Sequence, residues 1–276
     1  MALYDARTGR LIRRWSDSGN PSRLFEALVF SHDGQLLASS DGDVIHVWET
    51  ATSKPIATFK GHRGDVSFLS FRGDDSRLAS ASFDSTVLIW DPTGLGEKSA
   101  ALPSMTDAMR EQCWKTLAGD DARLAQHAIW ALAAHRDKSI PFLQSRLRPV
   151  QAVDSKRLAR LLNDLDSDRF DTREQAVREL EKLGELAEPA LRRVLQDKPT
   201  LEQRRRIEPI LSKLESRVPS GETLRSLRAV RAVEHIGTPE ARRLLGELTS
   251  GADAAMLTRA AREAEKRLSR QSHEPR

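Results

Sequence analysis

The sequence predicts a multidomain chain with two parts, an all-β part made of partial propeller blades and an all-α part made of helical repeats. Three observations predict it. Residues 1–103 hold 10 of the 14 aromatic residues and 9 of the 15 glycines, and no aromatic residue follows Phe170. A tryptophan followed by an acidic residue recurs after 42 residues in the first part. From Ser104 onward the apolar residues change from a period of two to a helical period of about 3.6.

Composition also predicts where the two parts meet. The segment PTGLGEKSAALP, from Pro92 to Pro103, combines proline, glycine and serine and is typical of a linker. The net charge changes at the same place, from −2 before Ser104 to +6 from Ser104 onward. We therefore expect partial blades over residues 1–91, a linker over 92–103, helical repeats over 104–270 and a disordered tail over 271–276.

The β part is a repeat of short strands. Trp48 and Trp90 lie 42 residues apart, and the segments that end at them, LVFSHDGQLLASSDGDVIHVW and LSFRGDDSRLASASFDSTVLIW, align along their length. A period of about 40–45 residues with a recurring Trp-Asp is typical of propeller blades, which have about four strands each. In the second segment we expect strands over residues 66–71, 77–82 and 86–90.

The motifs of this repeat resemble those of WD40-repeat proteins. One copy carries the full form, with Gly-His at 61–62, Asp84 in a tight turn and Trp-Asp at 90–91. In that family a histidine, a strand serine or threonine, the turn aspartate and the tryptophan form a buried chain of hydrogen bonds. The resemblance implies such a structural tetrad here, at His62, Ser80, Asp84 and Trp90. The preceding copy has no Gly-His, which implies an incomplete chain of hydrogen bonds in that blade.

A catalytic interpretation of the same residues is weaker. His62, Asp84 and Ser80 are the residue types of a hydrolase triad, but their spacing fits a blade and the sequence has no G-x-S-x-G turn. The histidine is expected to be buried and bonded to the aspartate, since a buried imidazole needs a partner.

The blades are too few to close a ring. A propeller needs about four to eight blades, and the sequence supplies one full blade, a second that lacks its last strand and the end of a third. We expect a fragment of a longer protein or, less favoured, an assembly that finds its missing blades elsewhere. The open strand edge also favours weak self-association.

The α part carries apolar stripes from which about ten helices are expected. Thr200 with Gln203 predicts a capping box, and Thr238 before Pro239 predicts another helix start. The segment DSDRFDTREQAVRELEKLGELAEPALRRVL resembles a HEAT-like repeat, with looser copies around Pro141 and Pro239. Nearly the whole chain resembles the C-terminal part of bacterial multidomain WD40-repeat proteins with a HEAT-like helical tail, in which both modules serve as binding platforms. Because its helices have their own stripes and caps, we expect the α part to fold without the blades.

Basic residues offer one candidate site in the α part. Arg204, Arg205 and Arg206 follow one another, and Arg192 and Arg193 lie on the preceding predicted helix. Neighbouring helices of a solenoid could combine them into a basic patch for phosphates. Three consecutive helical residues fan over about 200°, however, and glutamates flank them, so a solvated helix face is the stronger interpretation.

The rest of the sequence shows no recognised chemistry. Motifs for phosphate loops, dinucleotide binding, zinc proteases and EF-hands are absent, and the one cysteine, Cys113, rules out an internal disulfide and a multi-cysteine zinc site. We expect no catalytic residue, no cofactor and no metal. No apolar run reaches the length of a membrane span, and the lack of a recognisable targeting segment favours a cytoplasmic location.

These observations favour a non-catalytic protein–protein interaction scaffold whose partners are other proteins. The net charge of +4, from 44 basic and 40 acidic residues, gives no argument for nucleic acid. Two alternatives stay open: a HEAT-like enzyme or enzyme accessory of the lyase or DNA-repair type, and a nucleic-acid-binding module. A concave pocket with convergent polar and aromatic groups would favour the enzyme. Strongly salt-dependent binding would favour the nucleic-acid module.

Overall fold

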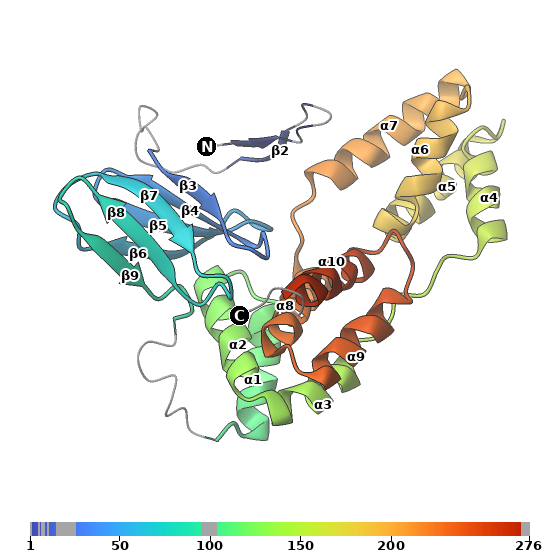
Figure 1. The fold of residues 1–276 in the computed structure, drawn as a ribbon. Coiled ribbons are helices and arrows are strands. Elements are labelled where there is room, and N and C mark those ends of the chain that lie inside the picture. The colour runs from blue at the N-terminus through green and yellow to red at the C-terminus, as the bar shows by residue number, and fades with distance from the viewer. Residues whose placement is uncertain are drawn as a thin grey trace.

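Strands come first along the chain and helices follow. The computed structural model describes residues 2–4, 6, 9, 11–14, 26–94 and 104–271. Within them the sheets gather on one side of the molecule and the helices on the other (Figure 1). The β part therefore precedes the α part as the composition predicts.

The strands form three antiparallel sheets. β1 (Ala2–Tyr4) and β2 (Leu11–Arg14) form a hairpin. The four-stranded sheet contains β3 (Leu28–Phe30), β4 (Leu36–Asp41), β5 (Val44–Glu49) and β6 (Pro55–Lys60). The three-stranded sheet contains β7 (Val66–Phe71), β8 (Leu78–Ser82) and β9 (Val87–Trp90). This is the predicted series of a blade end, a four-stranded blade and a blade without its last strand, and the expected strands begin within one residue of the observed ones.

The two larger sheets pack on one another around a single apolar cluster. Its members include Leu36, Ala38, Ile45 and Val47 from one sheet and Val66, Leu69, Phe71 and Leu78 from the other. β7 lies against β3 and β4, and the Val66 N–H donates to the Gly42 carbonyl across the sheets at 2.9 Å. Because side chains alternate along a strand, each sheet can offer one apolar face to its neighbour.

Ten α-helices follow within the described residues. They are α1 (Asp107–Leu117), α2 (Ala122–Ala134), α3 (Arg136–Arg146), α4 (Ser155–Asp164), α5 (Phe170–Leu183), α6 (Glu188–Gln196), α7 (Leu201–Ser216), α8 (Gly221–Ile236), α9 (Pro239–Thr249) and α10 (Met256–Gln271). Thr200 and Gln203 exchange hydrogen bonds of 3.1 Å at the start of α7, so the predicted capping box is confirmed. Thr238 caps α9 immediately after Gly237 ends α8 with a φ of 63°.

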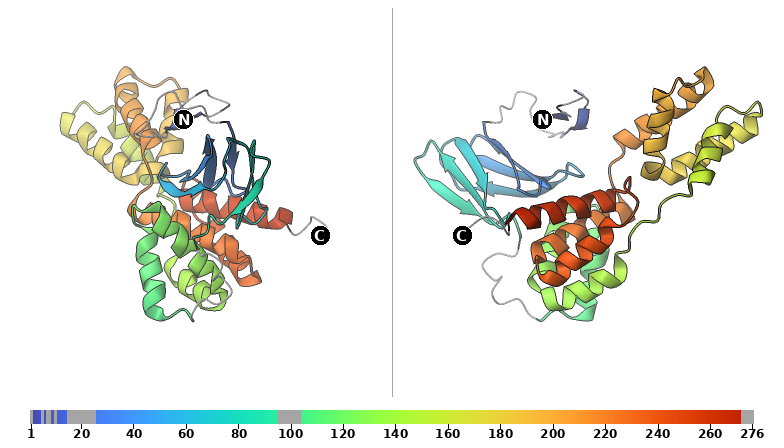
Figure 2. Two further views of the ribbon diagram at one scale, coloured as in Figure 1. Left: turned by 90° about the vertical axis from the view of Figure 1, so that its left-hand side faces the viewer. Right: turned by 45° about the vertical axis from the view of Figure 1, so that its right-hand side comes forward.

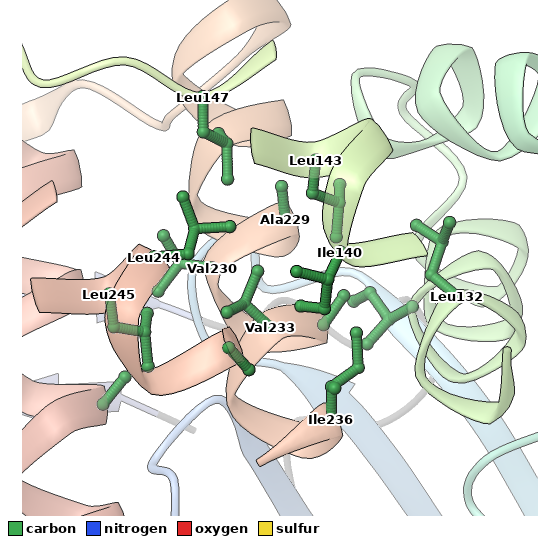
Figure 3. Packing of buried hydrophobic residues seen from close by; sticks show 14 of the residues in the cluster. Leu132, Ile140, Leu143, Leu147, Ala229, Val230, Val233, Ile236, Leu244 and Leu245 are labelled. Atoms are coloured by element: carbon green, nitrogen blue, oxygen red, sulfur yellow. The ribbon is translucent and has the colours of Figure 1, made fainter. Parts of the chain in front are cut away.

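The helices form two units with separate apolar cores. α1–α3 and α8–α10 form the inner bundle around one apolar core. Within it, α8 contacts each of the other five helices. Side chains from α2, α3, α8 and α9 meet there (Figure 3). α4–α7 form the outer bundle around Leu180, Leu191 and Ile207, and it stands apart from the inner one (Figure 2).

This arrangement differs from one continuous stack of helical repeats. The chain leaves the inner bundle after α3, builds the outer bundle and returns with α8 (Figure 2). The chain returns because α8 has buried residues on every side and therefore needs a place at the centre of the inner bundle. Pro141 lies inside α3, whereas Pro189 and Pro239 lie in the first turns of α6 and α9, so the three prolines are not equivalent. The HEAT-like character of the helices stays a prediction.

The start of the predicted linker is packed against the protein. The Pro92 carbonyl accepts a hydrogen bond from the Gln126 side chain of α2 at 3.2 Å. Thr93 is 4% exposed, and its N–H donates to the Asp91 carboxylate at 2.8 Å, an arrangement typical of an aspartate-led turn. Residues 95–103 and 272–276 lie outside the described residues, and Gln271 is the last residue of α10.

Candidate interaction surfaces

The four predicted tetrad residues lie together at the three-stranded sheet, Ser80 and Trp90 on its strands and His62 and Asp84 in the segments beside them. His62 is 4% exposed, and its Nε2 lies 2.7 Å from Ser80 Oγ. Its Nδ1 lies 3.2 Å from Asp84 Oδ2 and 3.0 Å from Thr86 Oγ1. The Trp90 indole N–H donates to Ser80 Oγ at 2.8 Å. Thr86 is a fifth member that the motif did not indicate.

Asp84 is held by donors on two segments. The Thr86 hydroxyl donates to Asp84 Oδ1 at 2.6 Å, and the Arg63 backbone N–H donates to Oδ2 at 2.7 Å. These hydrogen bonds hold the pKa of Asp84 well below its usual range. Ser80 is 1% exposed, and its oxygen already accepts the indole N–H. This geometry favours a structural role, because a nucleophilic serine needs a free approach for substrate.

The four-stranded sheet contains the tryptophan–serine hydrogen bond of the tetrad. The Trp48 indole N–H donates to Ser39 Oγ at 3.1 Å, as Trp90 does to Ser80. Trp48 packs with Leu37 and with Leu3 of the N-terminal hairpin. The two blades therefore share the tryptophan–serine link, which ties adjacent strands.

One face of the three-stranded sheet is apolar and open. Across the strands Phe68 pairs with Ala81 and Ala81 with Val87, while Ala79 pairs with Ile89, so these five residues share a face. Phe68, Val87 and Ile89 are 61%, 67% and 64% exposed, whereas the core side chains of β7 and β8 on the opposite face are at most 4% exposed. We call these five residues the outer β face. It includes Val87 and Ile89 of β9, an edge strand of its sheet.

Two buried ion pairs join α8 to the blades. Arg228 Nε and Nη2 donate to Glu49 Oε1 and Oε2 at 2.7 and 2.8 Å. Arg231 Nε donates to Asp33 Oδ2 at 2.6 Å. Side-chain exposure is 7% or less for all four residues, which we call the α8 dock. Burial raises the pKa of Asp33, but the Arg231 charge and the hydrogen bonds from Ser31 and the Gln35 N–H act together against it, and the pKa lies below its usual range.

A stacked ring pair lies beside the α8 dock. His235 of α8 stacks on Trp130 of α2, with ring centroids 4.2 Å apart. Burial lowers the pKa of His235 to about 4, and the nearby Arg231 charge acts in the same direction. His235 is therefore neutral at neutral pH, which suits its place against the Trp130 indole and near the Arg231 charge.

Sequence reasoning missed the α8 dock, although a signal was present. Leu224, Arg228, Arg231 and His235 follow one another at spacings of four, three and four. That spacing is the stripe of a helix face, and here the structure buries it. Arginines at stripe positions thus indicate a polar interface, yet the stripe alone does not identify Glu49 and Asp33 as partners.

The predicted basic residues of α6 and α7 are not left as one uncompensated group. Arg192 contacts the carboxylates of Glu188 and Glu215, both at 2.8 Å. Arg206 likewise contacts two glutamates, one on its own helix and one on α5. Arg193, Arg204 and Arg205 are exposed. The solvated-face interpretation of these residues accounts for this arrangement.

Two negative findings apply to the described part of the chain. No cluster of three histidine, cysteine or acidic side chains there has a geometry that could hold a metal ion. None of the described helices combines the length and apolarity of a membrane span.

Comparison with known proteins gives a family match to the second blade. The family model described as "WD domain, G-beta repeat" matches residues 53–91. The chain is 34% identical over 94 residues to "Periodic tryptophan protein 2" of Saccharomyces cerevisiae, covering 33% of this chain and 10% of that protein. It is 40% identical over 76 residues to "Cilia- and flagella-associated protein 57" of Mus musculus, covering 27% of this chain and 6% of that protein. The solved "RRP9 WD40 repeats" share 31% identity over 33% of this chain and 28% of that chain, with a TM-score of 0.30.

These comparisons concern the blades. The chain spans a tenth or less of the two curated relatives named here. Both relatives are eukaryotic, so they do not support the bacterial origin expected from the sequence, which stays a prediction. With the tryptophan–serine links and the matched family, the chain contains a WD40 repeat at residues 53–91.

Proposed function

We propose that this chain is a non-catalytic protein-interaction scaffold and that its blades bind other proteins through the outer β face. WD40-repeat proteins are typically interaction scaffolds, and the match at residues 53–91 supports this class. The closed hydrogen-bond chain around His62 adds support, since it leaves Ser80 no path to a substrate.

The observation that carries the proposal is the outer β face itself. Three large apolar side chains on one face are more than 60% exposed, and contiguous apolar surface of this kind marks an interaction site. Among the described residues, no strand pairs with the outer side of the edge strand β9, which leaves that edge for a partner strand. A partner that supplies an antiparallel strand and an apolar sheet face satisfies both features at once.

A weak contact between copies of the chain follows from the same surface. When no partner is present, the outer β face of one copy can cover that of another. Lysine on an edge strand blocks such pairing because its charge stays in water. We therefore expect the mass from analytical ultracentrifugation to rise with concentration, and the double variant Val87→Lys/Ile89→Lys to abolish the rise.

The matched control is Leu201→Lys. Leu201 is 67% exposed on α7, away from the sheets, so its change adds charge without touching the outer β face. If Leu201→Lys abolished self-association to the same extent, general charge repulsion would be the cause. A strictly monomeric parent chain would remove the outer β face as the basis of the proposal.

A further inference from the structure

A groove lies in the outer bundle where α5 and α7 end. Its volume is about 670 Å³. It is lined by Arg178, Glu181 and Lys182 from α5, and by Ile210, Lys213, Leu214, Ser216 and Arg217 from the end of α7. None of the motifs of the sequence indicated it.

Parallel packing of α5 and α7 creates the groove. Arg206 contacts Glu174 at 2.7 Å, and Lys213 contacts Glu181 at 3.0 Å. Both contacts join residues 32 positions apart, and the second lies seven residues, or about two turns, beyond the first on both helices. The helices therefore run in the same direction, and their C-terminal ends lie side by side. Basic side chains at these two ends are brought to one place.

The groove carries an uncompensated positive charge. Four of its eight lining residues are basic and one is acidic. Lys182 and Lys213 contact glutamates, whereas Arg178 donates to the neutral side-chain amide of Gln175. Among the described residues no carboxylate pairs with the guanidinium of Arg217. Two arginines therefore remain for an anionic partner.

In two other clefts the numbers of basic and acidic lining residues are closer to equal. The cleft between α8 and α10 is lined by three arginines and two glutamates, and the cleft between α3 and α9 by two arginines and three acidic residues. Basic residues also complement the negative end of a helix dipole. That role accounts for Lys182 and Lys213, which lie in the last turns, but Arg178 precedes the last turn of α5. Its place in the groove calls for another explanation.

The floor of the groove is apolar. Ile210 is 2% exposed, and Leu214 packs on the outer-bundle core. A basic rim over an apolar floor complements a segment with acidic and apolar faces. Nucleic acid is a poorer match, since single strands need aromatic platforms for stacking and no aromatic residue follows Phe170.

We propose that the α5–α7 groove binds an acidic amphipathic helix of a partner protein. Its acidic side chains pair with Arg178 and Arg217, and its apolar face covers Leu214. This is a second binding surface, independent of the outer β face.

The test is fluorescence anisotropy with the full chain and a labelled peptide of ~16 residues, with leucines at helical spacing and glutamates on the opposite face. We expect saturable binding that Arg178→Glu/Arg217→Glu weakens at least about tenfold. The control is Arg193→Glu/Arg205→Glu, which reverses two exposed arginines of the same bundle that do not line the groove. Binding by the control variant should stay within about twofold of the parent.

Peptide variants separate the two parts of the interaction. Replacing the glutamates by glutamine tests the charge, and polyglutamate tests charge without an apolar face; both should bind more weakly than the original peptide. Equal weakening by the groove and control variants would overturn the proposal, as would no binding at all. Tighter, groove-dependent binding of a single-stranded RNA would also overturn it.

Discussion

Arginines have opposite environments in the inner and outer parts of this molecule. Arg228 and Arg231, in the inner bundle, are 3% and 5% exposed and pair with blade carboxylates. Arg204, in the outer bundle, is 55% exposed and lies 3.8 Å from the nearest carboxylate, that of Glu208. In both places several arginines lie on one helix. The difference is whether another part of the chain packs over them.

This difference sets what each arginine contributes to stability. Exposed ion pairs contribute about 0–1 kcal/mol, because water and salt screen them. A buried pair adds little net stability over an apolar pair, but removing one partner leaves an uncompensated charge and costs about 3–5 kcal/mol. The α8 dock therefore specifies how the blades sit on the helices, whereas exposed outer arginines such as Arg204 stay accessible to a partner.

The largest expected effect comes from Arg228→Met. Glu49 would remain buried without its charged partner, and the Leu117 and Gly119 carbonyls would each lose a hydrogen bond. We expect the free energy of unfolding to fall by about 3–5 kcal/mol, measured by urea denaturation followed by circular dichroism. Arg204→Met is the control and should change it by less than about 1 kcal/mol.

A double variant sharpens this prediction. Glu49→Met combined with Arg228→Met removes both charges, so it should be more stable than Arg228→Met alone. Equal stability of the single variants Arg228→Met and Arg204→Met would show that the inner and outer arginines do not differ as described.

A smaller effect is expected for His62→Ala. The change leaves the buried Ser80 hydroxyl, and the more exposed Asp84 and Thr86, without their shared partner. We expect a loss of about 1–3 kcal/mol in the free energy of unfolding. Thermal unfolding should show it as a lower midpoint, and an unchanged midpoint would speak against a stabilising tetrad.

The smallest expected effect is a pH dependence from His235. Its pKa is about 4 in the folded chain and about 6.5 in an unfolded one. Between these values the unfolded state binds a proton that the folded state does not, so stability falls as pH falls. From about pH 7 to about pH 5.5 this group lowers the free energy of unfolding by about 1 kcal/mol.

His235→Phe isolates that contribution. Phenylalanine keeps an aromatic ring beside Trp130 and cannot titrate. The difference in stability between parent and variant should therefore change by about 1 kcal/mol over this pH interval. Parallel stability curves would mean that His235 is protonated to the same extent in both states. Asp33 acts in a lower range, since its pKa lies below that of an ordinary aspartate.

The blade and its hydrogen-bond chain could be predicted because their spacing is local and repeated. His62, Ser80, Asp84 and Trp90 lie within one repeat, so a motif places them on neighbouring strands, and the structure brings them together. Thr86 escaped because a hydroxyl two residues after an aspartate is common in turns and gives no specific signal.

The α8 dock and the basic patch depend on contacts that no local pattern contains. Arg231 meets Asp33 across 198 positions, and Arg206 meets Glu174 across 32. The second contact follows from the direction in which α5 and α7 pack. The run Arg204–Arg206 therefore suggested an excess of positive charge at a place where the neighbouring helix α5 supplies a glutamate for Arg206. The two arginines that line the groove, Arg178 and Arg217, are far apart in sequence and form no run.

The long span of the α8 dock has a consequence for synthesis on the ribosome. Translation at about 5–20 residues per second needs on the order of 10–40 s to proceed from Asp33 to Arg231. From the time Trp90 has been made until α8 follows, the blades exist without α8, and Asp33 and Glu49 stay hydrated on their surface. Docking is then a late step that withdraws both carboxylates from water. A chain interrupted before α8 releases blades with two acidic groups available to any basic helix that reaches them.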